Sequence, residues 1–269
     1  METRKFDMHV HTMEGSPDSS VSIMECVKIL KEKGYGGMLV TDHNSYKGYE
    51  AMTFSEKQNL GDFVVLRGIE YDTFGSGHML IIMPEGKIPK GLYHRGLPLA
   101  TVLRIVHENG GIIGPAHPCG EPFLSFYSTG FWFKQKDLRS KIMEEFDFLE
   151  GYNACEVPDN NLKARKAAAF YKKPMTAGSD SHKADCVGLG WTDLPSDIKC
   201  EDDLIRYIKT KPDIYIGGRF YGKSTKEKLG KANHFLVYGF FYYNKAQNLA
   251  HQLIRVAKRH NNFDPGEKL

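Results

Sequence analysis

The chain has 269 residues, of which 41% are hydrophobic, and its formal net charge is +3. This length suits one large α/β domain or two small ones, and the apolar content is typical of a chain that buries a core rather than of a disordered one. No apolar run approaches the roughly 18–20 residues that a membrane helix needs, so no membrane partner is expected. The net charge is too small to indicate nucleic acid as the ligand.

Five cysteines are scattered along the chain, and none belongs to a Cys-x-x-Cys pair. An odd and dispersed set argues against a disulfide framework and against a thiolate zinc site, and it favours a reducing compartment. The amino terminus has no apolar signal region, so we expect a cytoplasmic protein.

Positive charge is concentrated at the carboxyl end. Residues 219–269 hold ten Lys or Arg and three acidic residues, which gives this stretch +7 and leaves −4 for the remainder. A basic tail can hold a polyanion or a membrane surface, although a solvated helix face is the more common reason for such a run. We expect a main domain over 1–218 and a basic extension over 219–269 that packs on the same domain.

Strand and helix patterns alternate along most of the chain. Short apolar runs predict strands over 5–11, 38–41, 63–70, 78–82, 112–114, 146–151, 175–177, 215–217 and 235–243. Helical spacing of apolar residues predicts helices over 23–33, 46–58, 98–109, 134–145, 162–172, 201–209 and 244–259. This alternation indicates an α/β fold, with a parallel sheet that is covered by helices and is either open or closed into a barrel.

The first expected strand carries two histidines, His9 and His11, at alternate positions. Side chains alternate faces along a strand, so these two imidazoles should lie on one face. Neutral imidazole nitrogens are good ligands for zinc, iron and manganese, and the pair therefore forms half of a candidate metal site.

Five expected strands end at or next to a potential metal ligand. These residues are His11, His43, Glu70, His117 and Asp180. Parallel α/β folds assemble their sites at the carboxyl ends of strands, so these side chains should converge although they are far apart in sequence.

Six short motifs follow one another along the chain. They are Asp7-x-His9-x-His11-Thr12, Thr41-Asp42-His43, Glu70, Gly77-His78, Ala116-His117-Pro118 and Gly178-Ser179-Asp180-Ser181-His182. Their order and position resemble the PHP family, named for polymerase and histidinol phosphatase. The resemblance implies an α/β fold of the distorted (β/α)7 TIM-like barrel type, with a metal site at the carboxyl ends of the strands.

The resemblance also implies a set of ligands for two or three divalent ions. The first ion would be held by His9, His11, Glu70 and Asp180. The second would be held by Glu70, His78 and His117, so that Glu70 bridges. The third would take His43, His182 and a carboxylate from the loop after His11, where Asp18 is favoured over Glu14. Such mixed histidine and carboxylate sites accept manganese, iron, zinc or magnesium.

The function that the resemblance implies is a metal-dependent phosphoesterase. A hydroxide that bridges the ions would hydrolyse a phosphomonoester of a small metabolite or nucleotide. Glu70 and Asp180 would anchor this nucleophile, and His182 could protonate the leaving group. Arg165 and Lys183 are candidates for contact with the substrate phosphate. Asp7 and Asp42 are expected to orient imidazoles.

Three alternatives stay open from the sequence. The enzyme could be a histidinol-phosphate phosphatase or an exonuclease that acts on nucleic-acid ends, and a non-enzymatic metal-binding module is the third reading. An aromatic-rich stretch, residues 123–133, follows His117 and could stack a base, although a packed satellite core or an interface is the more common role.

Overall fold

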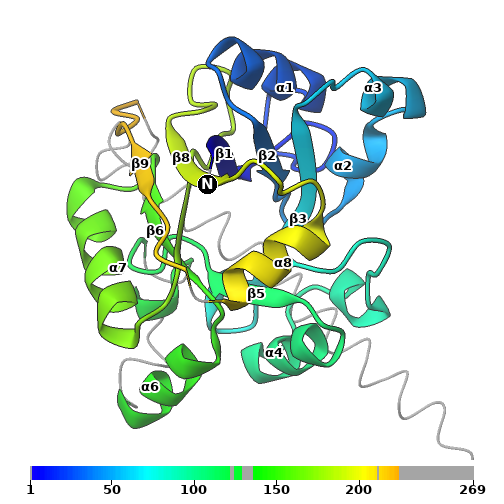
Figure 1. Ribbon diagram of the computed structural model, residues 1–269. Coiled ribbons are helices and arrows are strands. Elements are labelled where there is room, and N and C mark those ends of the chain that lie inside the picture. Colours follow the sequence, from blue (N-terminus) through cyan, green and yellow to red (C-terminus); the bar gives the residue numbers. More distant parts are fainter. Residues whose placement is uncertain (1, 122–123, 129–135, 211, 224–269) are drawn as a thin grey trace, which may run out of the picture.

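The computed structural model describes residues 2–121, 124–128, 136–210 and 212–223 (Figure 1). The expected helix over 244–259, the expected strand over 235–243 and most of the basic extension lie outside these residues. None of the helices in the described ranges has the length and apolar character that a membrane span requires.

Nine strands form two sheets in the described part of the chain. They are β1 (Thr3–Val10), β2 (Gly37–Val40), β3 (Val64–Thr73), β4 (Gly77–Ile82), β5 (Ile112–Pro115), β6 (Leu149–Asn153), β7 (Met175–Gly178), β8 (Gly190–Pro195) and β9 (Ile216–Gly218). Seven of them pair in the order β5-β4-β3-β2-β1-β8-β9, and β6 pairs with β7. Strand β8 is absent from the sequence-based prediction.

The β6–β7 pair completes a barrel-like curl. At one side the Asp147 amide, just before β6, donates to the Ile113 carbonyl of β5 at 2.9 Å. At the other side the Asp180 amide, just after β7, donates to the His9 carbonyl of β1 at 2.8 Å. The predicted α/β fold of the distorted-barrel type is therefore confirmed, as a curled sheet joined to a separate parallel pair.

The expectation of a parallel sheet is only partly correct. Pairs β1–β2, β2–β3 and β6–β7 are parallel, whereas β4 runs antiparallel to both β3 and β5. A short connection joins β3 to β4, and such a connection favours an antiparallel neighbour. The consequence is functional: His78 stands at the start of β4, yet it lies at the same edge as the end of β3, opposite Asp72.

Helices cover the sheet from outside. They are α1 (Ile23–Glu32), α2 (Lys47–Ala51), α3 (Phe54–Gln58), α4 (Leu99–Glu108), α6 (Lys136–Glu145), α7 (Pro158–Tyr171) and α8 (Glu201–Lys209). The single helix expected over 46–58 is in fact two, because Thr53 and Glu56 form a reciprocal capping box that begins α3.

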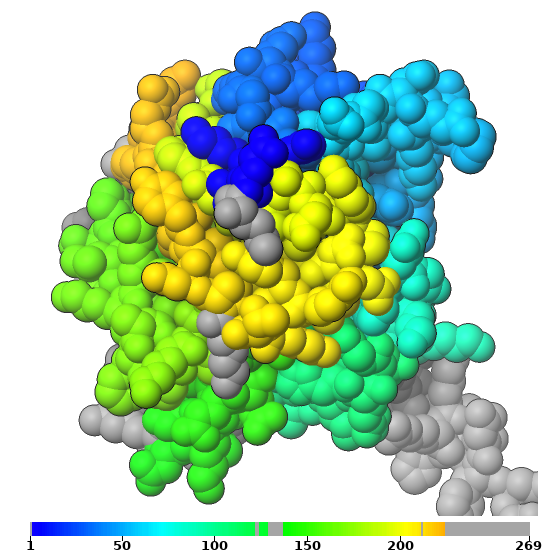
Figure 2. All heavy atoms as spheres, viewed as in Figure 1, coloured from blue at the N-terminus to red at the C-terminus, as the bar shows by residue number. Residues whose placement is uncertain are grey.

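Helix α8 closes one end of the barrel. Its buried residues Leu204, Ile205 and Ile208 pack in one apolar cluster with Phe6 and Met8 of β1. Figure 2 shows this face filled by α8 and the beginning of the chain. The amino-terminal ends of the parallel strands are therefore buried under α8. A functional site can form only at their carboxyl ends.

A β-bulge in β1 changes which side chains face inward. Phe6 and Met8 belong to the interior cluster, but Val10 packs in another cluster with residues of α1. The pairing with β2 shifts by one residue between Asp7 and Val10. An extra residue of this kind re-aims the following side chains. The bulge thus turns Val10 toward α1 and leaves His9 and His11 on the interior side.

The ion pair between His107 and Asp147 joins the last turn of α4 to the segment before β6, with His107 Nε2 and Asp147 Oδ2 3.0 Å apart. The hydrogen bond to Asp147 raises the pKa of His107 above its ordinary value of 6.5. A raised histidine pKa stabilises the fold fully below the unfolded pKa, and this contribution disappears as the pH rises through the folded pKa.

We therefore expect His107→Gln to lower the melting temperature by about 1–3 °C near pH 5.5, a small effect because the pair is partly exposed. The difference from wild type should shrink above neutral pH. His94→Gln, at an exposed side chain, serves as the control in thermal melts across the same pH range. A deficit that grows with pH would contradict this account.

Candidate metal centre

Nine side chains from distant parts of the sequence meet at the carboxyl ends of the parallel strands and the start of β4. They are His9, His11, Asp18, His43, Glu70, His78, His117, Asp180 and His182. Most of them are buried, and three groups of three offer ligand atoms that all lie within 4.8 Å of one another. These groups are His9–His11–Asp180, His43–Glu70–His78 and His11–His43–His182.

Glu70 is the centre of this arrangement, and its carboxylate is 1% exposed. Its Oε1 atom lies 2.9 Å from His78 Nδ1 and 3.0 Å from His117 Nε2. Its Oε2 atom lies 3.0 Å from His43 Nδ1 and 3.2 Å from His11 Nε2. One carboxylate therefore faces two separate groups of imidazoles, which is the geometry that a bridging ligand needs.

Asp180 faces His9 of β1 and His11, which follows that strand. Its Oδ1 atom lies 3.2 Å from His11 Nε2 and 3.5 Å from His9 Nε2. The backbone of Asp180 has a φ of 52°, in the left-handed region that few residues other than glycine adopt. Gly178 makes the approach of this turn possible, because a Cβ atom at that position would lie 2.4 Å from the His9 amide nitrogen.

Asp18, rather than Glu14, lies beside the outer histidines. Its Oδ2 atom is 3.4 Å from His43 Nε2 and 3.3 Å from His182 Nε2. The Glu14 carboxylate instead accepts the Ile23 amide at 3.1 Å and so caps the start of α1.

Two features of the buried atoms fit bound cations. Glu70 Oε2 is buried and has no hydrogen-bond donor in the described part of the chain. His9 Nε2 and His11 Nε2 lie only 3.0 Å apart. A hydrogen bond between them would leave one nitrogen without its lone pair, whereas a cation accepts both. Histidine and carboxylate donors are the ligands of zinc, iron and manganese, so the residues fit divalent metal ions.

The electrostatics also favour positive charge here. Burial alone would raise the pKa of Glu70, but the imidazoles of His43, His78 and His9 hold it well below its usual range. Burial likewise opposes ionisation of Asp180, and His9 and His11 nevertheless lower its pKa well below normal. Burial lowers the pKa of His9, and the carboxylates of Glu150, Asp180 and Glu70 outweigh it, so that the net shift is strongly upward.

Backbone and side-chain acceptors fix which nitrogen each histidine offers. Glu150 Oε1 lies 2.8 Å from His9 Nδ1, and the Asp180 carbonyl lies 3.0 Å from His182 Nδ1. Because these oxygens only accept, Nδ1 carries the proton and Nε2 presents its lone pair. For His182 this leaves Nε2 as the atom that could act as a ligand, and proton donation by His182 to a leaving group remains a prediction.

Glu150 is the residue that the sequence analysis missed. It is 1% exposed, and besides holding His9 it accepts the His117 amide at 2.6 Å and the Asn153 side-chain amide at 3.1 Å. Pairing of β6 with β7 shifts by one residue between Glu150 and Tyr152. This second bulge brings Glu150 and Asn153, three residues apart, to the same site. An acidic residue inside an apolar strand was the only signal in the sequence.

The two aspartates beside the ligands act in different ways. Asp42 accepts the Ser16 hydroxyl at 2.9 Å, and Ser16 Oγ lies 3.1 Å from His11 Nδ1, so Asp42 orients an imidazole through Ser16. Asp7 accepts the amides of Ser179 and Gly188 at 2.8 and 2.9 Å. Asp7 therefore holds the backbone before Asp180 rather than an imidazole. Burial raises the pKa of Asp7 to about 6.

The two expected phosphate contacts, Arg165 and Lys183, have different surroundings. The Arg165 guanidinium stacks over the Tyr152 ring at 5.5 Å, and Arg165 Nε donates to the Gly151 carbonyl at 3.4 Å. Lys183 is exposed and follows His182 directly. Their contact with substrate remains a prediction.

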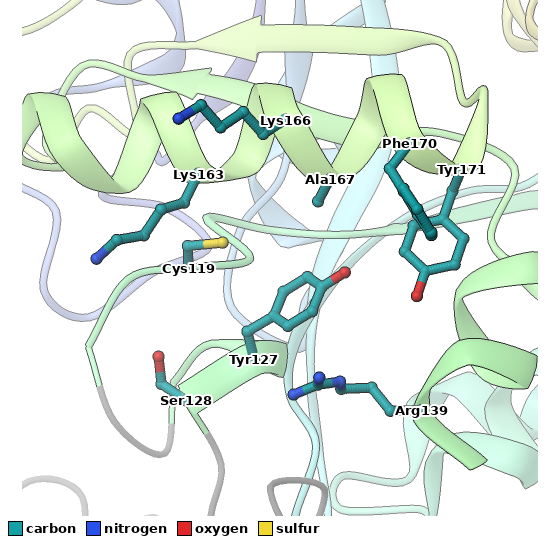
Figure 3. Close-up of a pocket in the computed structure, with 9 residues that line it drawn as sticks. All are labelled: Cys119, Tyr127, Ser128, Arg139, Lys163, Lys166, Ala167, Phe170 and Tyr171. Atoms are coloured by element: carbon teal, nitrogen blue, oxygen red, sulfur yellow. The ribbon is translucent and has the colours of Figure 1, made fainter. Parts of the chain in front are cut away.

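The aromatic stretch after His117 is partly described. Phe126 is buried and packs edge-on against Phe146, in the apolar cluster that also contains Ile69 and Met79. Tyr127 instead lines a groove of about 550 Å³ between α6 and α7, and we call it the α6–α7 groove (Figure 3). Its lining residues are Cys119, Tyr127, Ser128, Arg139, Lys163, Lys166, Ala167, Phe170 and Tyr171. Residues 129–135 of the aromatic stretch lie outside the described residues.

Comparisons with known proteins agree with this architecture. A family model described as PHP-associated matches residues 158–211. An uncharacterized protein of Methanocaldococcus jannaschii is 32% identical over 123 residues, which cover 42% of this chain and 67% of that protein.

Among solved structures, the fold resembles a two-domain protein from Bacteroides vulgatus that contains a predicted PHP-like metal-dependent phosphoesterase. The TM-score is 0.52 at 15% identity, over 81% of this chain and 65% of that one. It also resembles a lesion-specific endonuclease, Endonuclease Q, from Pyrococcus furiosus, with a TM-score of 0.52 at 18% identity over 80% and 58% of the two chains. This chain thus spans less than two thirds of both structures, and at these identities the likeness concerns the fold.

Glu150 provides a test of the site geometry. We expect Glu150→Gln to weaken binding of divalent metal by about 10–100-fold, the usual effect of losing a group that orients a ligating histidine. Glu145→Gln, at an exposed position of α6, removes the same charge without touching the centre. Metal content after dialysis, measured by atomic emission, distinguishes the two variants. Equal metal content in both would rule out this role for Glu150.

Proposed function

The chain belongs to the PHP family, and we propose that it is a metal-dependent phosphoesterase that hydrolyses a phosphomonoester of a small metabolite or nucleotide. The observation that supports this most directly is the Glu70 carboxylate, which lies between two groups of imidazoles with one oxygen toward each. A ligand set of this kind, buried at the open end of a barrel, is suited to adjacent cations.

We adopt the assignment of ligands that the family resemblance implies. His9, His11, Glu70 and Asp180 would hold one ion, and Glu70, His78 and His117 a second. His43, His182 and Asp18 would hold a third. When bound, such ions supply a nucleophilic water at neutral pH and neutralise charge on the phosphoryl oxygens.

The protein's own contribution is orientation. Glu150 and Ser16 contact the Nδ1 atoms of His9 and His11, so that both Nε2 atoms point to one place. Ser125 Oγ lies 3.1 Å from His117 Nδ1, and this leaves Nε2 toward Glu70. Ligands held this way need little rearrangement when substrate binds, which lowers the cost of reaching the transition state.

Replacement of Glu70 tests the proposal. Glu70→Gln keeps the shape of the side chain but removes the bridging charge, so we expect phosphate release to fall by about a thousandfold or more, since such ions contribute several kcal/mol. His107→Gln, away from the centre, should retain near-normal turnover. The assay is phosphate release from a panel of phosphomonoesters with manganese supplied. Comparable rates in the two variants, or no release by wild type from any substrate, would refute the proposal.

A second candidate function, hydrolysis at nucleic-acid ends, is favoured by the α6–α7 groove. Lys163 and Lys166 of α7 line the groove together with Tyr127 and Arg139 (Figure 3). Neither lysine forms an ion pair with any residue that the structure describes, and no acidic side chain lines the groove. Phe170 at its rim is 78% exposed. Cations interleaved with aromatic rings are typical of single-strand binding, and the similar Endonuclease Q acts on damaged nucleic acid.

The salt dependence of binding distinguishes the two functions. If the groove binds the backbone of a single strand, the double variant Lys163→Ala/Lys166→Ala should reduce the slope of log affinity against log salt by about 1.4, since each lost contact contributes about 0.7. Lys28→Ala/Lys199→Ala removes the same charge from exposed positions elsewhere. Fluorescence anisotropy with a labelled oligonucleotide measures both. Identical slopes would exclude the groove as the binding surface.

A further inference from the structure

Two free thiols lie against each other beside the metal centre. Cys155 follows β6 and Cys186 lies in the connection from β7 to β8, and their sulfur atoms are 3.5 Å apart. No other two cysteine sulfurs in the described part of the chain are recorded in contact. The sequence analysis treated all five cysteines as isolated, because these two are 31 residues apart along the chain.

The pair is unsuited to binding a metal ion of its own. Neither Cys155 nor Cys186 belongs to any group of three or more potential ligands among the described residues. Both thiols instead donate to backbone carbonyls: Cys186 Sγ lies 3.3 Å from the Ser179 oxygen, and Cys155 Sγ lies 3.4 Å from the same oxygen and 3.5 Å from that of Asp180. The thiols therefore hold the backbone turn that carries Asp180.

We propose that Cys155 and Cys186 are a modification site, at which a peroxide oxidises the two thiols to a disulfide and thereby loosens the Asp180 turn. A disulfide requires the sulfurs to approach to about 2.05 Å, a movement of less than two ångströms that side-chain rotation can supply when the Cβ atoms are suitably placed. The claim about the metal centre rests on the proposed function; the formation of the bond does not.

The chemistry balances with hydrogen peroxide as the only co-reactant. Cys155 is the more accessible of the two thiols, since it is half-buried whereas Cys186 is 1% exposed. The Cys155 sulfur attacks one peroxide oxygen, the O–O bond breaks, and a sulfenic acid and one water form. The Cys186 sulfur then attacks the Cys155 sulfur and displaces a second water. Two thiols are oxidised and one peroxide is reduced to two waters.

Loss of the two thiol protons weakens the support of the backbone turn that carries Asp180. Oxidation removes both S–H donors, so the Ser179 carbonyl loses both of its thiol contacts and the Asp180 carbonyl loses one. The Asp180 carbonyl also accepts the His182 Nδ1 proton, and the residue holds a left-handed backbone conformation that depends on its surroundings. Two proposed ligands, Asp180 and His182, thus share the turn that the thiols support.

The first measurement is the mass of the full chain after one equivalent of hydrogen peroxide, followed by peptide mapping. Wild type should lose two hydrogen atoms, give a linked Cys155–Cys186 peptide and recover with dithiothreitol. Cys186→Ser should instead gain one oxygen on Cys155. Cys119→Ser, which changes a half-buried thiol outside the pair, should link as wild type does. No linked peptide in wild type would overturn the proposal.

The second measurement is the metal content of oxidised and reduced wild type after dialysis. We expect oxidation to lower metal retention about tenfold, the scale seen when a group that supports a ligand is lost. Cys155→Ser, whose hydroxyl still donates to the carbonyls, should retain metal after the same treatment. A linked chain that keeps its metal would overturn the effect on Asp180. If reduced wild type binds no metal at all, the proposed function fails, and the mass measurement still decides whether the bond forms.

Discussion

The organisation of this protein depends on one buried carboxylate. Glu70 brings a negative charge into the barrel, at a cost that only opposite charge can offset. Four imidazoles, those of His11, His43, His78 and His117, approach its two oxygens at 2.9–3.2 Å. His78 lies in β4, and His11, His43 and His117 follow β1, β2 and β5. These four strands flank β3, which carries Glu70, with two strands on each side.

Several irregular features of the fold serve the same purpose. The antiparallel direction of β4 brings His78 to the edge at which β3 ends. Gly178 lets the chain before Asp180 pass against β1, where a Cβ atom would collide with His9. Helix α8 fills the opposite end of the barrel with apolar side chains. The apolar side chains that stabilise the fold thus lie at one end of the barrel, and the ionisable side chains of the candidate metal centre lie at the other.

The sequence predicted the parts of this arrangement that local pattern determines. Apolar runs that end in histidine or carboxylate identified His11, His43 and His117 as candidates, because strand ends have recognisable composition. Glu150 was not identified, because an acidic residue in an apolar strand reveals its partner only when the strand is placed against β7. The choice between Asp18 and Glu14 likewise depends on the path of one loop. The antiparallel direction of β4 and the closure of the barrel by β6 and β7 are decided by long-range pairing, which short motifs do not encode.

The two β-bulges have a consequence for how this chain tolerates change. Strict alternation would turn His9 and His11 toward α1, and the extra residue between Asp7 and Val10 prevents this. The bulge between Glu150 and Tyr152 lets the side chains of Glu150 and Asn153 reach the metal centre together. Deletion of a single residue at either bulge would therefore turn ligand side chains away from the site, although every ligand residue would still be present in the sequence. The number of residues in these two strands therefore matters to the metal centre as much as the identity of its ligands. We expect relatives that keep all the histidines but differ in the length of these strands to differ in chemistry.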